Sequence, residues 1–230
     1  MSAGRTARER VRAELIREIT EIARRQLATE GAAGLSLRAV AREMGMVSSA
    51  IYRYFPSRDD LLTALIIDGY NAVGEAVERA DAKAGAGDFA GRWLAVCRAV
   101  REWALEHPHE YALLYGSPVP GYKAPDDTVP AAMRDTVVLA RIITGAHAAG
   151  ALEPAGPCPP ALAGDAARVR AAVFMDVPDE VIVRALTAWA GLYGTVSFEL
   201  FGQFNNVIEE RAAYFDHAMT LLGRLVGLTP

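Results

Sequence analysis

SLRAVAREMGMVSSAIYRYFPSRDDLL, at residues 36–62, is the stretch of sequence that decides the fold. Apolar residues recur in it every three or four positions, first up to Gly45 and then up to Phe55. Ser36 is a suitable N-cap for the first run, and Gly45 can adopt the positive φ of a tight turn. Two short helices joined by a tight turn can present one helix end to the major groove of DNA. The stretch therefore predicts a helix-turn-helix.

The rest of the chain has the same spacing of apolar residues, and strict alternation never lasts long enough to predict a strand. The pattern predicts helices at about 7–30, 37–44, 48–54, 57–80, 89–107, 108–115, 129–147, 161–175, 176–202 and 206–226. Segments rich in Gly or Pro, at 81–87, 116–128 and 150–160, are expected to be loops. The sequence thus predicts an all-α protein, with a helix-turn-helix head over residues 1–56 and a helical body over residues 57–230.

The formal net charge of −4 hides a division between the head and the body. Residues 1–55 hold ten Arg and six acidic residues, a net charge of +4, so the rest of the chain carries −8. A basic head suits contact with phosphate groups, whereas an acidic body does not. A surface charge that is merely uneven would give the same totals, so the division supports nucleic-acid binding without establishing it.

The composition does not support a secreted or membrane protein. Cys97 and Cys158 are too few for a disulfide framework, and Cys97 lies in an apolar helical run where a buried thiol is expected. The N-terminus alternates Arg and Glu and does not resemble a signal peptide. No run of about 18 apolar residues predicts a membrane span. We therefore expect a soluble, cytoplasmic protein with no membrane partner.

Patterns typical of catalysis and metal binding are weak. The glycines that follow residue 84 have the wrong spacing for a dinucleotide-binding loop, and Ser117 lacks the second Gly of a nucleophile elbow. His107 and His109 lie among glutamates at a predicted helix end, where contact with solvent is a simpler explanation than a metal site. The sequence predicts no catalytic residues, no metal site and no cofactor.

The helix-turn-helix carries a resemblance to a known family. Gly45, the run IYRYFPSR at residues 51–58 and the leucines at 61–62 resemble the signature of the TetR family of transcriptional regulators. Upstream, LSLRAVA at residues 35–41 is similar to the family's usual T-x-R-x-I-A stretch. The resemblance covers residues 10–65 and implies a regulator that binds double-stranded operator DNA.

The C-terminal region resembles one branch of the same family. WAGLYG at residues 189–194, followed by Glu199 and Leu200, is similar to the ligand-binding and dimerisation domain that carries a Trp-His-Gly-type motif. The His that precedes Gly in that motif is absent from this chain.

The resemblance implies that the second short helix reads DNA. Val47, a poor N-cap, stands where many relatives have Ser, and long base-reading side chains are scarce in this helix. Arg53 alone could pair with guanine in a bidentate manner, but its place near the helix end suits phosphate better. The Arg-rich residues 5–12 are candidates for contact along the DNA backbone or in a minor groove. Base readout is assigned to Ser48, Ser49, Ala50 and Tyr52, and phosphate contact to Ser36, Arg38, Arg53, Tyr54 and Arg58.

The last two predicted helices carry broad apolar faces. Both could complete the core of one subunit, or pair with a second copy as an isologous four-helix bundle. We expect a homodimer, because one short helix reads few bases and a twofold pair reads a palindrome. The candidate interface residues are Leu186, Trp189, Tyr193, Val196, Leu200, Phe204, Phe215, Met219 and Leu222.

The resemblance also implies a small-molecule pocket in the body, whose occupation tilts the helix that begins at Ser57 and changes the spacing of two heads. Candidate wall residues are Trp93, Trp103, His107, Tyr111, Tyr115, Met133 and Phe174, each of which could instead be ordinary core. The apolar composition favours an apolar or aromatic effector. The expected function is a repressor released from its palindromic operator by this effector. An activator of the same fold, an enzyme and a protein-interaction module are the alternatives.

Overall fold

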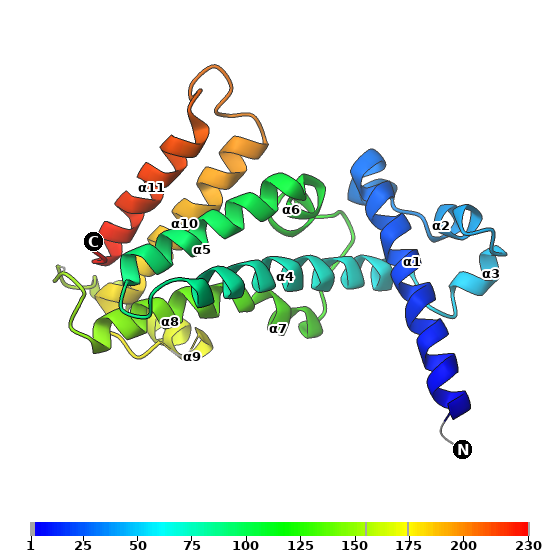
Figure 1. Cartoon of the computed structure of the whole chain (residues 1–230), viewed down its shortest axis with the longest axis horizontal. Coiled ribbons are helices and arrows are strands. Elements are labelled where there is room, and N and C mark those ends of the chain that lie inside the picture. Colours follow the sequence, from blue (N-terminus) through cyan, green and yellow to red (C-terminus); the bar gives the residue numbers. More distant parts are fainter. Residues whose placement is uncertain (1–2, 155, 174, 230) are drawn as a thin grey trace. The chain divides into compact units, whose positions relative to one another are not determined.

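The computed structural model describes residues 3–154, 156–173 and 175–229, with side chains from residue 7 onward (Figure 1). The described part consists of helices joined by loops, with an isolated β-bridge between Leu152 and Leu228, so the predicted all-α fold is confirmed. The α-helices are α1 (Ala3–Gly34), α2 (Leu37–Glu43), α3 (Ser48–Ile51), α4 (Arg58–Lys83), α5 (Phe89–Glu106), α6 (Pro108–Tyr115), α7 (Val129–Ala132), α8 (Arg134–Ala148), α9 (Ala163–Val173), α10 (Asp179–Leu200) and α11 (Arg211–Val226). Short 3-10 helices lie at Asp126–Thr128 and Pro160–Leu162.

The helices form two compact units. Unit 1 contains Met1–Gly69 and His109–Thr128, and unit 2 contains Tyr70–Pro108 and Val129–Pro230. α4 begins in unit 1 and ends in unit 2. A single uninterrupted helix is therefore part of both units.

Unit 1 is built around the helix-turn-helix. α1 packs on α2, and α2 packs on α3 (Figure 1). The buried apolar side chains are Ile19, Ile22, Ala23 and Leu27 from α1, Leu37, Val40 and Ala41 from α2, Ile51 from α3, and Leu61, Leu62 and Leu65 from α4. They follow the three-to-four spacing that predicted amphipathic helices.

The predicted signals for the ends of helices act as expected in unit 1. The Ser36 hydroxyl accepts a hydrogen bond from the Ala39 amide at 3.4 Å and caps α2. The Ser57 hydroxyl accepts one from the Asp60 amide at 3.1 Å and caps α4. Gly31 adopts φ 69° and ψ 176°, which kinks α1 directly after its predicted end at residue 30.

Several predicted helices differ from the structure. The last one begins at Arg211 instead of residue 206, and α1 extends to Gly34 beyond its kink. α3 ends at Ile51 instead of residue 54, because the Arg53 and Tyr54 amides donate to the carbonyl groups three residues earlier, at 3.2 and 2.9 Å. The single helix expected over 129–147 is divided into α7 and α8, with Met133 between them.

The core of unit 2 lies among α5, α8, α10 and α11. α5 contacts each of the other three, and α10 lies beside α11 (Figure 1). Burial raises the pKa of the Cys97 thiol, and the expected buried thiol is confirmed. The other buried side chains include Trp93, Val96 and Val100 from α5, Ile142 and Ile143 from α8, Leu192 and Val196 from α10, and Phe215 and Met219 from α11.

Two arginines of α5 fix this helix to its neighbours in unit 2. Arg101 donates to both carboxylate oxygens of Glu199 on α10, at 2.7 and 2.6 Å. Arg98 donates to both carboxylate oxygens of Asp216 on α11, at 2.8 and 2.7 Å, and these hydrogen bonds lower the pKa of Asp216. Paired hydrogen bonds of this kind fix direction as well as distance.

By length and composition, α10 could cross a membrane. Core helices of soluble proteins pass the same test, and Ile182, Leu192 and Val196 of α10 are buried in unit 2. The length and composition of α10 are therefore weak evidence for a membrane span.

A carboxyl group is buried in unit 2 near the start of α8. Asp135 is 3% exposed and accepts hydrogen bonds from the hydroxyls of Tyr193 and Thr136. Burial raises the pKa of Asp135, and the hydrogen bond from Tyr193 opposes part of this effect. The unfolded chain therefore releases this proton at a lower pH than the folded protein does. Folding stability is lost as pH rises from the unfolded pKa, about 3.9, to the folded one.

We predict that Asp135→Asn raises the free energy of unfolding at pH 7–8, because the amide keeps an acceptor for Tyr193 and is never charged. The gain should shrink as pH falls toward about 4, where the wild-type carboxyl is protonated in both states. Urea unfolding at several pH values measures this difference in the free energy of unfolding. Asp135→Ala is the control, and it should destabilise at every pH because it leaves the Tyr193 hydroxyl without its acceptor. A stability difference between Asn and Asp that does not change with pH would contradict the prediction.

Candidate nucleic-acid interface

The turn between α2 and α3 is fixed by its backbone. Gly45 has φ 66°, and the Met46 amide donates to the Ala41 carbonyl at 2.8 Å. Ile51 and Phe55 are buried and anchor α3 on the core of unit 1. The orientation of α3 is therefore set by packing on its inner face, which leaves the outer face open.

α3 and the turn that follows it carry the residues predicted to read bases, together with Arg53, which was predicted to contact phosphate. Ser48, Ser49, Tyr52 and Arg53 are exposed, whereas Ala50 is half-buried. Tyr52 keeps 42% of its surface accessible, which is unusual for a large aromatic residue without a ligand or partner. Small hydroxyl groups and one tyrosine are thus the chemistry that α3 can present to a groove.

Arg12 of α1 joins the far end of α3, a contact that sequence reasoning missed. Its guanidinium donates to the Arg53 carbonyl at 3.2 Å and lies 5.2 Å from the centre of the Tyr54 ring. A hollow of about 330 Å³ beside this contact is lined by Ala7, Arg8, Val11, Arg12 and Tyr54. Because Arg12 and Tyr54 are 42 residues apart, the basic N-terminal sequence was the only available signal.

The residues predicted to position the backbone of DNA differ in their surroundings. Arg38 is exposed on α2, and Tyr54 is half-buried under Arg12. Ser36 is half-buried, and its amide donates to the Gln26 side chain at 3.3 Å. Arg58 donates to the carbonyl groups of Ala32, Ala33 and Leu35, at 2.6, 3.4 and 3.2 Å. These contacts tie the start of α4 to the end of α1 and give Arg58 a structural role inside unit 1.

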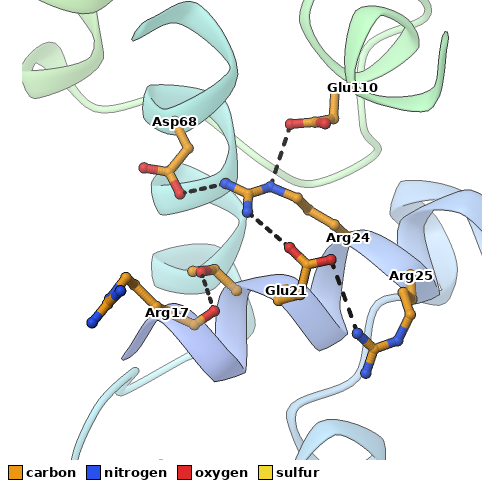
Figure 2. A network of polar contacts seen from close by, with 7 residues as sticks. Arg17, Glu21, Arg24, Arg25, Asp68 and Glu110 are labelled. Carbon is orange, nitrogen blue, oxygen red and sulfur yellow. Dashed lines mark hydrogen bonds and ion pairs between the residues drawn. The ribbon is translucent and has the colours of Figure 1, made fainter. Parts of the chain in front are cut away.

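A second arginine network orients α1 within unit 1. Figure 2 shows the guanidinium of Arg24 between the carboxylates of Asp68 on α4 and Glu110 on α6, with nitrogen–oxygen distances of 2.8 and 3.4 Å. Arg24 also pairs with Glu21 at 3.3 Å, and Arg25 donates to Glu43 on α2 at 2.7 Å. α1 is therefore held to α2, α4 and α6 by charged groups as well as by its apolar face.

A groove between α4 and α5 lies within unit 2. Its volume is about 660 Å³, and its lining includes small side chains at a spacing of four, namely Ala72, Ala76 and Ala80 on α4 and Ala95 and Ala99 on α5. Six charged side chains also line it, namely Glu75, Arg79, Lys83, Arg98, Glu102 and Glu106. Trp103 and His107 line it as well, with their ring centroids 5.5 Å apart. The Trp103 indole nitrogen is buried and has no hydrogen-bond partner among the described residues.

The structure brings only some of the predicted effector residues together. Trp103 and His107 share the groove, whereas the indole of Trp93 donates to the Met219 carbonyl at 2.8 Å in the core of unit 2. Tyr111 is fully buried in unit 1, 5.0 Å from the ring of Tyr115. Met133 is half-buried in unit 2, and Phe174 lies outside the described residues.

The predicted dimer residues divide into two groups. Leu186 and Trp189 of α10 are exposed, and Leu200, Phe204 and Leu222 are half-buried. Tyr193, Val196, Phe215 and Met219 belong to the core of unit 2. Other apolar side chains are exposed instead, namely Phe198 and Phe201 near the end of α10 and Tyr214, Leu221 and Leu225 on α11. Periodicity identified the apolar helices but could not separate their inner faces from their outer faces.

Comparison with known proteins agrees with this geometry at both ends of the chain. Residues 19–65 match the family model for bacterial regulatory proteins of the tetR family. Residues 93–222 match the model of the tetracyclin repressor-like C-terminal domain.

Individual relatives match over nearly the whole chain. The HTH-type transcriptional regulator Rv1816 of Mycobacterium tuberculosis is 40% identical over 95% of this chain and 93% of its own length. The crystal structure of SCO4313 is 37% identical with a TM-score of 0.76, covering 93% of this chain and 97% of that one. A protein from Rhodococcus sp. RHA1 is 28% identical with a TM-score of 0.69, covering 94% and 96%. The chain therefore belongs to the TetR family of transcriptional regulators and carries that family's helix-turn-helix DNA-binding domain.

Proposed function

We propose that the protein is a homodimeric repressor that binds a palindromic operator and is released by a small apolar or aromatic effector. The observation that carries the proposal is the exposed face formed by Ser48 and Ser49 on α3 and by Tyr52 and Arg53 in the turn after it. Ile51 and Phe55 are buried on the opposite side. A helix presented in this way fits the major groove. Operator binding would occlude the promoter, which is repression, and it requires the protein to be in the cytoplasm with the DNA.

Exposed apolar surface on the last two helices supports the dimer. Leu186 and Trp189 on α10 and Leu221 and Leu225 on α11 are each at least 37% exposed. Large apolar side chains gathered on two neighbouring helices mark an interaction surface in a soluble protein. A second copy that buries the same helices would form an isologous four-helix bundle and would pair two reading helices.

The groove between α4 and α5 is our candidate effector site. Its alanines and the Trp103 ring suit the apolar part of a ligand, and the charged side chains of the lining can bind one polar group of that ligand. α4 lines the groove with residues between 72 and 83 and continues without a break from its start at Arg58 in unit 1. A ligand that binds more tightly to one position of α4 can therefore shift the equilibrium between two positions of the head. The shift cannot exceed the difference in binding free energy between the two positions.

Operator binding tests the proposal directly. We expect Tyr52→Ala and Arg53→Ala each to weaken binding to a duplex selected from a random library by about 5- to 150-fold, the range for losing one specific contact. The thermal midpoint should not change, because both side chains are exposed. Arg17→Ala is the control, since Arg17 pairs with Glu14 inside α1. Fluorescence anisotropy measures the affinity, and a folded Tyr52→Ala protein that binds normally would refute the placement of α3.

The dimer is tested with a matched pair of substitutions. Leu221→Glu on α11 should yield monomers in sedimentation velocity and weaken operator binding by at least about 100-fold, because two linked heads bind with an effective concentration that one head lacks. Leu105→Glu on α5 is the control, since Leu105 is 42% exposed and Leu221 is 49% exposed. Leu105→Glu should remain dimeric. Equal effects of the two substitutions would contradict the proposed interface.

The effector site is tested by filling the groove. Small aromatic compounds are first screened for release of the wild-type protein from the selected duplex. Ala76→Phe should keep operator affinity and lose the response to the active compounds, because its ring occupies the groove. Ala82→Phe is the control, as Ala82 is exposed on the same helix outside the lining. An Ala76→Phe protein that responds like the wild type would place the effector elsewhere.

A further inference from the structure

Val47, at the start of α3, is the most exposed large apolar side chain among the described residues, at 71%. It occupies the N-cap position of the reading helix, directly before the exposed Ser48 and Ser49. Neither the sequence assignments nor the proposed function gives this residue a role.

Val47 makes no side-chain cap for its helix. The N-caps Ser36 and Asp88 accept hydrogen bonds from the Ala39 and Gly91 amides, at 3.4 and 2.8 Å, whereas Val47 offers no acceptor. Serine would suit this position better for the stability of α3, because N-cap preference strongly disfavours valine. An unfavourable residue at the tip of a binding helix, with no compensating contact in its own unit, indicates a role toward a partner.

The backbone holds this side chain in a fixed place. The Val47 carbonyl accepts a hydrogen bond from the Ala50 amide at 2.8 Å, and the preceding residue, Met46, is tied to Ala41 at 2.8 Å. A β-branched side chain also has few rotamers, so docking it costs little conformational entropy. Val47 is therefore preorganised for contact, whereas a long flexible side chain would lose more conformational entropy on binding.

We propose that Val47 reads thymine in the operator, by packing its methyl groups against the C5-methyl group of the base. The thymine methyl is the apolar group that the four natural bases show on their major-groove edges, so an apolar side chain at the groove can distinguish T from the other bases. Ser48 and Ser49 beside it present hydroxyl groups, so Val47 supplies the apolar contact at the tip. This inference rests on the operator binding proposed above and adds a specificity residue to it.

A single exposed valine is common on protein surfaces and needs no explanation in general. Val129, the first residue of α7 in unit 2, is such a residue at 52% exposed, and it belongs to neither the DNA-binding face nor the groove. It therefore provides a matched control for Val47.

The test combines a substitution in the protein with the removal of a methyl group from the DNA and measures the affinity of each combination. The duplex selected by the wild-type protein is synthesised with each thymine replaced in turn by deoxyuridine, which removes only the methyl group. We expect one thymine in each half-site to matter, with a loss of about 4-fold per methyl contact. Val47→Ser should bind the T and U duplexes equally and should keep or raise the thermal midpoint. Val129→Ser should retain the preference for T.

Val47→Ser that still prefers T over U as strongly as the wild type overturns the assignment. Wild-type binding that depends on no thymine methyl overturns it as well and leaves operator binding intact. A wild-type protein that selects no duplex overturns both this inference and the proposed function.

Discussion

The guanidinium of Arg24 is the interaction on which the geometry of unit 1 depends. It joins α1 to Asp68 on α4 and to Glu110 on α6, two helices that the chain reaches 44 and 86 residues later. Burial raises the pKa of Asp68, and Arg24 opposes this by favouring the carboxylate. Apolar packing alone lets helices slide, whereas this hydrogen-bonded pair fixes their register.

An arginine also holds the part of α4 that lies in unit 2. Arg134 donates to both carboxylate oxygens of Glu78 at 3.0 and 2.8 Å and to the Asn71 side chain at 2.8 Å, and its hydrogen bonds lower the pKa of Glu78. Each part of α4 is thus attached by an arginine to its own unit. Because α4 is fixed in both units, a change of its position in one unit changes its position in the other. Coupling between the proposed effector site and the head requires such a connection.

The sequence predicted the head better than the body, for a physical reason. The helix-turn-helix is specified by local signals, since Ser36, Gly45 and Ser57 act on residues three or four positions away. The groove of unit 2 is a tertiary feature, because the alanines at 72, 76 and 80 acquire meaning only when α5 packs beside them. The outer faces of α10 and α11 were predicted only in part, for a similar reason: Leu186 and Trp189 are exposed as expected, whereas Tyr193 and Phe215 are buried. A helix that is apolar all around does not show by its pattern which side its neighbours cover.

The chemistry of α3 limits how this protein can recognise DNA. Ser48, Ser49 and Ala50 cannot form the bidentate contacts that dominate direct readout. Affinity must then come from the basic residues around the helix, such as Arg12 beside Tyr54, and these contacts carry no base information. Sequence preference is left to methyl contacts at the tip and to the shape of the duplex. A head of this kind reads few bases on its own. In the proposed homodimer it would therefore gain more from a partner head at a fixed spacing than a head with long base-reading side chains would.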